Sequence, residues 1–284
     1  MIYIIREINS NDIADVVERL CIEAACDLGS DVESLIRAAA NNESLPRARF
    51  ILNQLIENIE IARNEQMPIC QDTGMTVVFV ELGQDVHIVG NYIEDAINEG
   101  VRRGYEKGYL RKSVVKDPLE RINTGDNTPA IIHIEIVPGS TLSITVAPKG
   151  FGSENMSALK MLKPADGVER VKKFVLDTVK AAGGNPCPPV IVGVGIGGTM
   201  EKAAYIAKKS LLRPAGQPNK NRAMAALEKE LLDSINSLGI GPQGLGGATT
   251  ALAVHIETFP THIAGLPVAV NMQCHVSRHK TAVL

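Results

Sequence analysis

The sequence has no tryptophan, and aromatic residues make up only 4% of its 284 residues. Lysine and arginine (29) nearly balance aspartate and glutamate (32), and no block of basic residues runs along the chain. Nucleic-acid-binding surfaces need clustered basic residues, often with aromatic side chains that stack on bases, so we expect no nucleic-acid partner. No apolar run approaches the roughly 18 residues that a membrane span needs, so we expect no membrane insertion.

Cysteine is also scarce, with five residues, an odd number. The first residues, MIYIIREINS, lack the basic start and long apolar core of a secretory signal. Both features argue against a disulfide framework and lead us to expect a cytoplasmic protein. Cys21 and Cys26 lie in a stretch of helical periodicity, where small thiols commonly pack in a core. Cys70, Cys187 and Cys274 lie instead among polar and turn-forming residues, in PICQD, NPCPP and MQCHV.

The apolar pattern indicates an α/β fold with one domain over residues 1–284, in which a helical part (about 1–66) precedes a mixed-sheet body. Helical spacing predicts helices at 11–27, 31–41, 45–66, 91–107, 166–182, 199–212 and 221–237. Apolar runs predict strands at 76–82, 251–256 and 266–271.

Turn-forming residues predict the connections between these elements. Ser30 or Asp31 is expected to cap the second helix, and Pro46 suits the first turn of the third. IIHIEIV and STLSITV, separated by Pro138-Gly139, predict an antiparallel hairpin. RPAGQPN (213–219) is the best candidate for an internal linker.

The three loop cysteines allow several chemistries. Structural zinc sites use closely paired ligands, and these cysteines form no CxxC pair. A nucleophilic cysteine would explain one thiol but not three. Three thiolates can hold an iron–sulfur cubane and leave one iron open to bind a substrate oxygen as a Lewis acid. From residue types alone, this cluster and three unrelated loop thiols both remain open.

The segment MPICQDTGM, residues 67–75, places Gln71, Asp72 and Thr73 directly after Cys70. If Cys70 binds iron, the Asp72 carboxylate would lie near the substrate and could move a proton or order a water. The simpler interpretation is that Asp72 caps a turn through its own backbone.

Residues VIVGVGIGGTMEKAAYIAKKSLL contain a short strand, a glycine loop and a helix, and Gly193, Gly195 and Gly198 spell GxGxxG. This motif allows a dinucleotide-binding hypothesis. Two features weaken it, because no acidic residue ends a strand about 20 residues onward and no clear parallel partner strand follows.

Other polar residues are candidates for binding dicarboxylates or moving protons. Arg111 suits a carboxylate contact, and Lys149 opens the glycine turn KGFGSEN, although single surface cations are usually just solvated. His133 and His255 lie within strands and are expected to be structural. His262, in the loop FPTHIAG, is the best acid/base candidate.

Several long motifs together resemble the class I, iron–sulfur-dependent fumarate hydratases, and more closely the α-subunit of their two-subunit form, shared with L(+)-tartrate dehydratases. The motifs are CQDTG, LRKSVVKDPLERINTGDNTPA, PKGFGSENMSALKML, NPCPPVIVGVGIGGTMEKAAYIAKKSLL, GIGPQGLGG and GLPVAVNMQCH. The resemblance covers nearly the whole chain. It implies that Cys70, Cys187 and Cys274 hold a 4Fe–4S cluster whose fourth iron contacts the substrate.

The resemblance also assigns substrate contacts. It implies substrate binding by Gln71, Arg111 and either Gly150 or Gly152, and catalytic roles for Asp72 and for His262 in proton transfer. The family's remaining contacts lie in a C-terminal domain that this sequence does not include. We therefore expect a separate β-subunit and a hetero-oligomer such as α2β2.

The resemblance implies reversible hydration of fumarate to L-malate, a dicarboxylate reaction, as the first expectation for function. Dehydration of L(+)-tartrate to oxaloacetate is the alternative. A nicotinamide-binding oxidoreductase built on Gly193–Gly198 and a cluster-bearing scaffold without catalysis are alternatives from other classes. Substrate profiling separates the first two, and NAD(H) binding in the absence of iron tests the third.

Overall fold

A computed structural model describes residues 5–284 and divides the chain into two compact units, each assembled from separate stretches of sequence. Unit 1 contains the described residues up to Leu28, together with Ile61–Gly150 and Arg278–Leu284. Unit 2 contains Gly29–Glu60 and Phe151–Ser277. Helices and mixed sheets confirm the predicted α/β class. The candidate linker RPAGQPN is not a boundary, because it lies inside unit 2.

Unit 1 is built on a four-stranded sheet with helices α1 (Ser10–Cys26) and α4 (Ile93–Lys107) packed against each other. The strands run in the order β10 (Lys280–Val283), β5 (Leu142–Lys149), β2 (Met75–Gly83) and β4 (Ile131–Val137). Apolar side chains from α1, α4 and the sheet form one buried core, and the hydroxyl of Tyr105, on α4, bonds the chain just before β2. A short parallel pair, β1 (Arg6–Asn9) and β3 (Val86–Val89), completes the unit.

The predicted hairpin between β4 and β5 is wrong. β2 lies between these strands, parallel to β4 and antiparallel to β5. The chain does bend at Pro138-Gly139, but the two strands that this bend joins each bond to β2 instead of to each other. The turn signal is local, whereas β2 comes from a distant part of the sequence.

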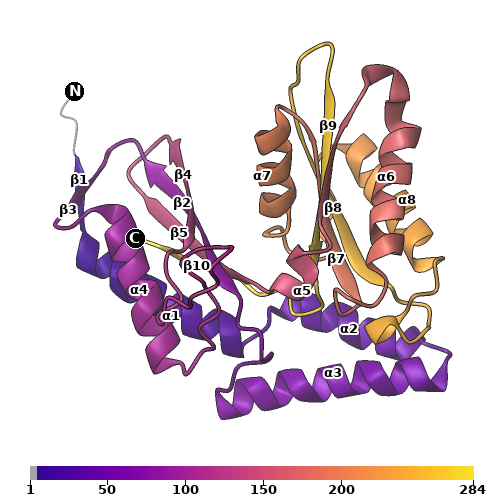
Figure 1. The fold of residues 1–284 in the computed structure, drawn as a ribbon, viewed down its shortest axis with the longest axis horizontal. Helices are drawn as coiled ribbons and strands as arrows, with labels where there is room; N and C mark the ends of the chain where they lie inside the picture. The colour runs from indigo at the N-terminus through magenta and orange to yellow at the C-terminus, as the bar shows by residue number, and fades with distance from the viewer. Residues whose placement is uncertain (1–4) are drawn as a thin grey trace. The chain divides into compact units, whose positions relative to one another are not determined.

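Unit 2 is built on the sheet β6 (Ala158–Leu162), β9 (Leu266–Gln273), β7 (Val190–Gly197) and β8 (Ala251–Phe259), in that order. Figure 1 shows α6 (Gly167–Ala182) and α8 (Arg222–Asn236) on one face of this sheet and α7 (Met200–Ser210) on the other. The unit also holds α2 (Ser30–Asn42), the first part of α3 (Pro46–Glu65), the short helix α5 (Phe151–Glu154), and the 3-10 turns η1 (Pro164–Asp166) and η2 (Pro242–Gly244).

The glycines of the GxGxxG motif are explained by packing. Gly193 lies in the strand, as expected from VIVGV, but β7 continues through Gly197, so Gly195 also lies in the strand and not in the expected loop. A Cβ atom on Gly193 would lie 2.2 Å from the carbonyl oxygen of Ala207, and one on Gly195 would lie 2.1 Å from that of Ala203. Helix α7 therefore packs closely on β7 because these positions lack side chains. The expectation that no parallel partner follows is also wrong, since β8 pairs with β7 in parallel.

The helix predictions hold closely, because α1, α2, α3, α4, α6, α7 and α8 all lie within a few residues of the expected ranges. Pro46 begins α3 as expected. The N-cap of α2 is Gly29, not Ser30 or Asp31, and it has no side-chain cap hydrogen bond. Within residues 5–284, no helix combines the length and apolar content that crossing a bilayer requires.

Candidate active site

The CQDTG segment forms a loop before β2 in unit 1, and buried side chains hold three of its consecutive carbonyl groups. The Arg278 guanidinium donates to the carbonyl oxygen of Asp72. The Tyr105 hydroxyl donates to the carbonyl oxygens of Thr73 and Gly74, at 2.9 and 3.0 Å. The Asn127 amide also donates to the Gly74 carbonyl, at 3.2 Å. The loop therefore has a rigid main chain, which suits a segment that must present several side chains together.

The two carboxylate oxygens of Asp72 have different surroundings. Its Oδ1 atom accepts a hydrogen bond from the main-chain N–H of Gly74 at 2.9 Å, so the turn-capping role is present. Its Oδ2 atom lies against Gly150, where an added Cβ atom would come within 3.2 Å of it. The cap fixes the orientation of the carboxylate and leaves Oδ2 beside the glycine turn. A structural and a chemical role for Asp72 are thus compatible.

The predicted carboxylate clamp, Arg111, is linked to the same loop. The Thr73 hydroxyl donates to the carbonyl oxygen of Arg111 at 2.9 Å, and the Arg111 side chain is exposed. The Asn127 Oδ1 atom accepts from the Ser113 N–H at 2.7 Å, while its Nδ2 atom donates to Gly74. Asn127 is fully buried and has a left-handed φ of 64°, a conformation that asparagine tolerates.

Unit 1 therefore brings together five of the predicted site residues: Cys70, Gln71, Asp72, Arg111 and Gly150. Cys70 is partly exposed, and its thiol lies 3.5 Å from the Gln71 Oε1 atom. A thiol, an amide, an oriented carboxylate and an exposed guanidinium are the groups needed to bind a metal and a carboxylate ligand.

The loops of Cys187 and Cys274 meet in unit 2. The His275 Nδ1 atom lies 2.9 Å from the carbonyl oxygen of Cys187. The Gln243 N–H donates to the Pro188 carbonyl oxygen at 2.7 Å, and its Nε2 atom lies 3.5 Å from His275 Nδ1. Cys187 has a left-handed φ of 55° and an exposed thiol, while the Cys274 thiol is partly exposed. The sequence signals for these contacts were the motifs GIGPQGLGG and MQCH, whose individual roles were not apparent.

The second glycine candidate, Gly152, lies near the Cys187 loop. Gly152 lies in α5 of unit 2, where an added Cβ atom would be 3.6 Å from the carbonyl oxygen of Asn185, two residues before Cys187. Gly150, in contrast, lies in unit 1 next to Asp72.

The loop thiols differ from the two helical thiols. Cys21 and Cys26 are buried in α1, and burial raises the pKa of Cys21 to about 12 and also raises the pKa of Cys26. Such thiols stay protonated and are poor metal ligands, because metals bind the thiolate. Cys70 and Cys274 are instead partly exposed, and Cys187 is exposed, so these three thiols are open to ligands from outside the core. Within the described residues, no group of three His, Cys, Asp or Glu side chains is arranged to hold a metal ion.

His262 lies at the opposite end of the unit 2 sheet from Cys187 and Cys274. Cys274 directly follows β9, and antiparallel pairing of Ile191 with Gln273 brings the start of β7, near Cys187, to the same end. His262 lies in the loop before β9, and the eight residues of this strand span roughly 25 Å. The His262 side chain lines an apolar cavity of about 460 Å³ with Ile263 and Val168. His262 therefore cannot reach the two cysteines of its own chain.

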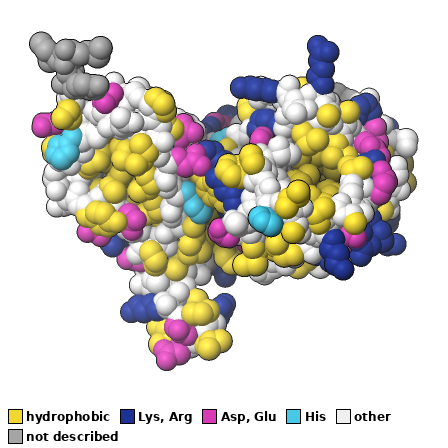
Figure 2. Space-filling model, turned by 90° about the horizontal axis from the view of Figure 1, so that it is seen from above, with side chains coloured by type: hydrophobic (Ala, Val, Ile, Leu, Met, Phe, Trp, Pro, Cys, Tyr) yellow, Lys and Arg dark blue, Asp and Glu magenta, His cyan; other side chains and the backbone are white. Residues whose placement is uncertain are grey.

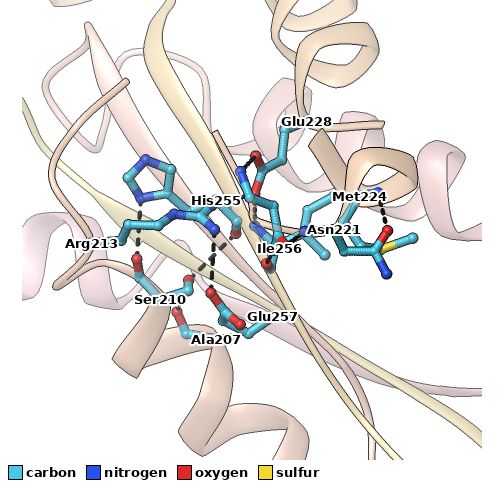
Figure 3. Close-up of polar contacts among 10 residues, drawn as sticks. Ala207, Ser210, Arg213, Asn221, Met224, Glu228, His255, Ile256 and Glu257 are labelled. Carbon is cyan, nitrogen blue, oxygen red and sulfur yellow. Dashed lines mark hydrogen bonds and ion pairs between the residues drawn. The ribbon is translucent and has the colours of Figure 1, made fainter. Parts of the chain in front are cut away.

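A separate polar network lies inside unit 2, where Arg213 pairs with Glu228 and lies 3.3 Å from Glu257 (Figure 3). His255, on β8, is 1% exposed, and its Nδ1 atom lies 3.1 Å from the carbonyl oxygen of Ser210. Burial and the positive charge of Arg213 lower the pKa of His255 to about 4. The network joins α7, α8 and β8, so its role is structural.

Charged side chains of both signs are interspersed with hydrophobic ones on the face shown in Figure 2.

Comparison with known proteins covers nearly the whole chain. A family model described as fumarate hydratase (Fumerase) matches residues 14–283. A Methanocaldococcus jannaschii protein named "Putative L(+)-tartrate dehydratase subunit alpha" is 47% identical over 94% of this chain and 95% of that protein. The L(+)-tartrate dehydratase subunit alpha of Escherichia coli strain K12 is 31% identical over 96% of this chain and 91% of its own length. The corresponding protein of strain UTI89 is 32% identical over 95% of this chain and 90% of its own length.

Proposed function

The chain belongs to the fumarate hydratase (Fumerase) family of hydro-lyases, and we propose that it is the α-subunit of an L(+)-tartrate dehydratase. The observation that carries the proposal is the similarity to proteins named as tartrate dehydratase α-subunits along almost the full length of the chain. Hydration of fumarate, the first expectation from the sequence, becomes the second candidate, supported by the description of the family model.

The proposed reaction removes water from a hydroxydicarboxylate. A proton leaves the carbon next to one carboxylate, hydroxide leaves the neighbouring carbon, and the enol formed from tartrate rearranges to oxaloacetate. Negative charge builds up on the carboxylate beside the carbon that loses its proton. Cationic groups and hydrogen-bond donors fixed around that carboxylate lower the barrier.

Several residues of unit 1 suit this chemistry. The exposed Arg111 guanidinium would bind a substrate carboxylate, and the Gln71 amide would donate to a substrate oxygen. Asp72 would move a proton through Oδ2, since Oδ1 bonds the Gly74 N–H. Glycine at 150 keeps the space beside Oδ2 open, while Gly152 would offer its backbone to the substrate from unit 2.

We further propose that Cys70, Cys187 and Cys274 are the ligands of a 4Fe–4S cluster. The support is their accessibility, in contrast to the buried thiols of Cys21 and Cys26. When bound, a cluster with one iron free of thiolate supplies a Lewis acid for a substrate oxygen.

His262 keeps its proposed role in proton transfer only if it acts on another copy of the chain. The length of β9 separates it from the cysteine loops of its own unit 2. An α2β2 assembly contains a second α-subunit and would also supply the β-subunit that the names of the relatives imply. We therefore retain α2β2 as the proposed assembly.

The proposal is tested with the chain co-produced with its β-subunit and purified without oxygen. The complex is given L(+)-tartrate, L-malate or fumarate, and oxaloacetate, fumarate and malate are quantified. We expect the conversion of tartrate to oxaloacetate to have a higher kcat/KM than the dehydration of L-malate or the hydration of fumarate. A higher kcat/KM for fumarate would favour the second candidate. A complex that binds a cluster but converts none of these substrates would contradict hydro-lyase function and favour the scaffold interpretation.

A further inference from the structure

Arg278 is a buried cation with unused donors. It follows the last residue of unit 2, belongs to unit 1 and is only 4% exposed. One of its N–H groups, on Nη2, donates to the carbonyl oxygen of Asp72. Within residues 5–284, its Nε and Nη1 atoms have no hydrogen-bond partner. A buried guanidinium normally has its donors satisfied, because leaving them unpaired away from water is costly.

Arg278 forms no ion pair among the described residues, although the Asp72 carboxylate also lies near Tyr105. Arginine stays protonated in proteins, so the charge cannot be lost by titration. The nearby Cys26 thiol and Tyr105 hydroxyl have pKa values raised by burial, so both are neutral. No ion pair joins Arg278 to a carboxylate of the described residues, and the Oδ1 atom of Asp72 is bonded to Gly74.

A second buried basic residue, Lys149, has its backbone beside the same loop. Lys149 is 5% exposed, and its backbone approaches Gly74 so closely that an added Cβ atom there would lie 2.7 Å from Lys149 N. Its Nζ atom donates to the carbonyl oxygen of Gly150 at 3.4 Å, so the basic group lies near the glycine beside Asp72.

We propose that the Arg278 guanidinium binds an anion at the Cys70–Gly74 loop. The anion is either a carboxylate of the substrate or the negatively charged cluster formed with Cys70 thiolate. Both would accept from a guanidinium N–H, and both would balance its charge. The inference rests on the proposed function and adds a residue that no sequence motif indicated.

The proposal also explains why the contact to Asp72 is made by arginine. A neutral amide would suffice to hold one carbonyl oxygen, as Asn127 does for Gly74. Arginine provides the same contact and retains donors for an anion, so the loop geometry and the anion would depend on one side chain.

The test compares Arg278→Gln and Arg278→Lys with Arg222→Gln, which removes an exposed guanidinium. Each variant is assembled with the β-subunit. The KM and kcat for L(+)-tartrate, iron content, and the midpoint potential of the cluster by EPR-monitored titration are measured. Thermal unfolding of each variant verifies that it is folded.

If the anion is the carboxylate, Arg278→Gln raises KM roughly tenfold or more with cluster content and potential unchanged, and Arg278→Lys recovers part of the loss. If the anion is the cluster, the potential falls and iron is lost in Arg278→Gln, while Arg278→Lys retains more. The inference about Arg278 is overturned if the wild-type complex is active and Arg278→Gln has the same KM, iron content and midpoint potential as Arg222→Gln. The proposed function would still stand in that case. Lack of activity and cluster in the wild type would instead overturn the proposed function. If Arg278→Gln does not fold, the same measurements are made on Arg278→Lys, which retains the positive charge.

Discussion

The Thr73 hydroxyl donates to the carbonyl oxygen of Arg111 at 2.9 Å. This hydrogen bond joins the loop that carries Cys70 and Asp72 to the segment that carries the proposed carboxylate clamp. Thr73 is 2% exposed, so the bond is protected from water. Together with Asn127, which bonds both Gly74 and Ser113, this buried hydroxyl sets the distance between the two parts of the proposed site.

Replacement of Thr73 with valine keeps the shape of the side chain and removes the hydroxyl. Loss of one such bond costs about 1 kcal/mol, so we expect KM for L(+)-tartrate to rise roughly fivefold. The kcat should change less, because the Asp72 carboxylate keeps its bond to Gly74. The control is Thr281→Val, which removes an exposed bond to Thr145. Equal KM values in both variants would show that the Thr73 bond does not position Arg111.

Asp72→Asn tests the proton-transfer role of the carboxylate. The asparagine oxygen can still accept from the Gly74 N–H, so the turn and the melting temperature should be retained. We expect kcat to fall by roughly 10²–10⁴-fold, the usual loss for a general acid or base. Asp117→Asn, which alters an exposed turn cap bonded to Leu119 and Glu120, is the control. A kcat within a few-fold of wild type would restrict Asp72 to its turn.

The GxGxxG motif illustrates how far sequence patterns lead in this chain. Helix ranges were predictable because their apolar spacing is regular and local. The role of Gly193 and Gly195 was not, since it depends on the carbonyl groups of α7 packed on β7. The position of β2 between β4 and β5 likewise depends on pairing between distant segments.

The candidate site shows the same division. Cys70, Asp72 and Arg111 could be identified because their motifs are long and their chemistry is distinctive. Arg278 could not, because a basic residue followed by His279 and Lys280 reads as an ordinary solvated surface until its burial is known. Asn127 was equally hidden in a polar loop, although it is fully buried and bonds two segments.

Gly195→Ala tests the packing explanation of the glycine motif. The new Cβ atom would lie 2.1 Å from the carbonyl oxygen of Ala203, so α7 or β7 must shift. We expect the free energy of unfolding to fall by about 3 kcal/mol or more, measured by urea denaturation. Gly265→Ala, whose nearest contacts would be 3.8 Å away, should be close to neutral. Equal stability of the two variants would contradict the packing role.

The buried His255 predicts a loss of stability in mild acid. Its pKa is lowered from 6.5 to about 4, mainly by burial and then by the charge of Arg213. Protonation of His255 therefore favours the unfolded chain. The free energy of unfolding is highest above pH 6.5, as far as His255 determines it, and falls as the pH is lowered toward 4. The loss by pH 5 should be roughly 2 kcal/mol.

Urea unfolding at pH 7.5 and pH 5 measures this loss. His255→Asn retains an amide for the Ser210 carbonyl but does not titrate, so its stability should change less between the two pH values. His87→Asn alters an exposed histidine and should behave as wild type. If His255→Asn loses as much stability as wild type, groups other than His255 account for the acid sensitivity.

The cluster proposal is tested most directly by EPR of the chain purified without oxygen, reconstituted with iron and sulfide, and mildly oxidised. We expect a 3Fe–4S signal near one per chain, which is lost when Cys70, Cys187 or Cys274 is replaced by alanine. The signal should persist in Cys21→Ala, because that buried thiol has a pKa of about 12 and is no ligand. Absence of the signal from the wild type, or its survival in all three loop variants, would show that these cysteines do not hold a 4Fe–4S cluster.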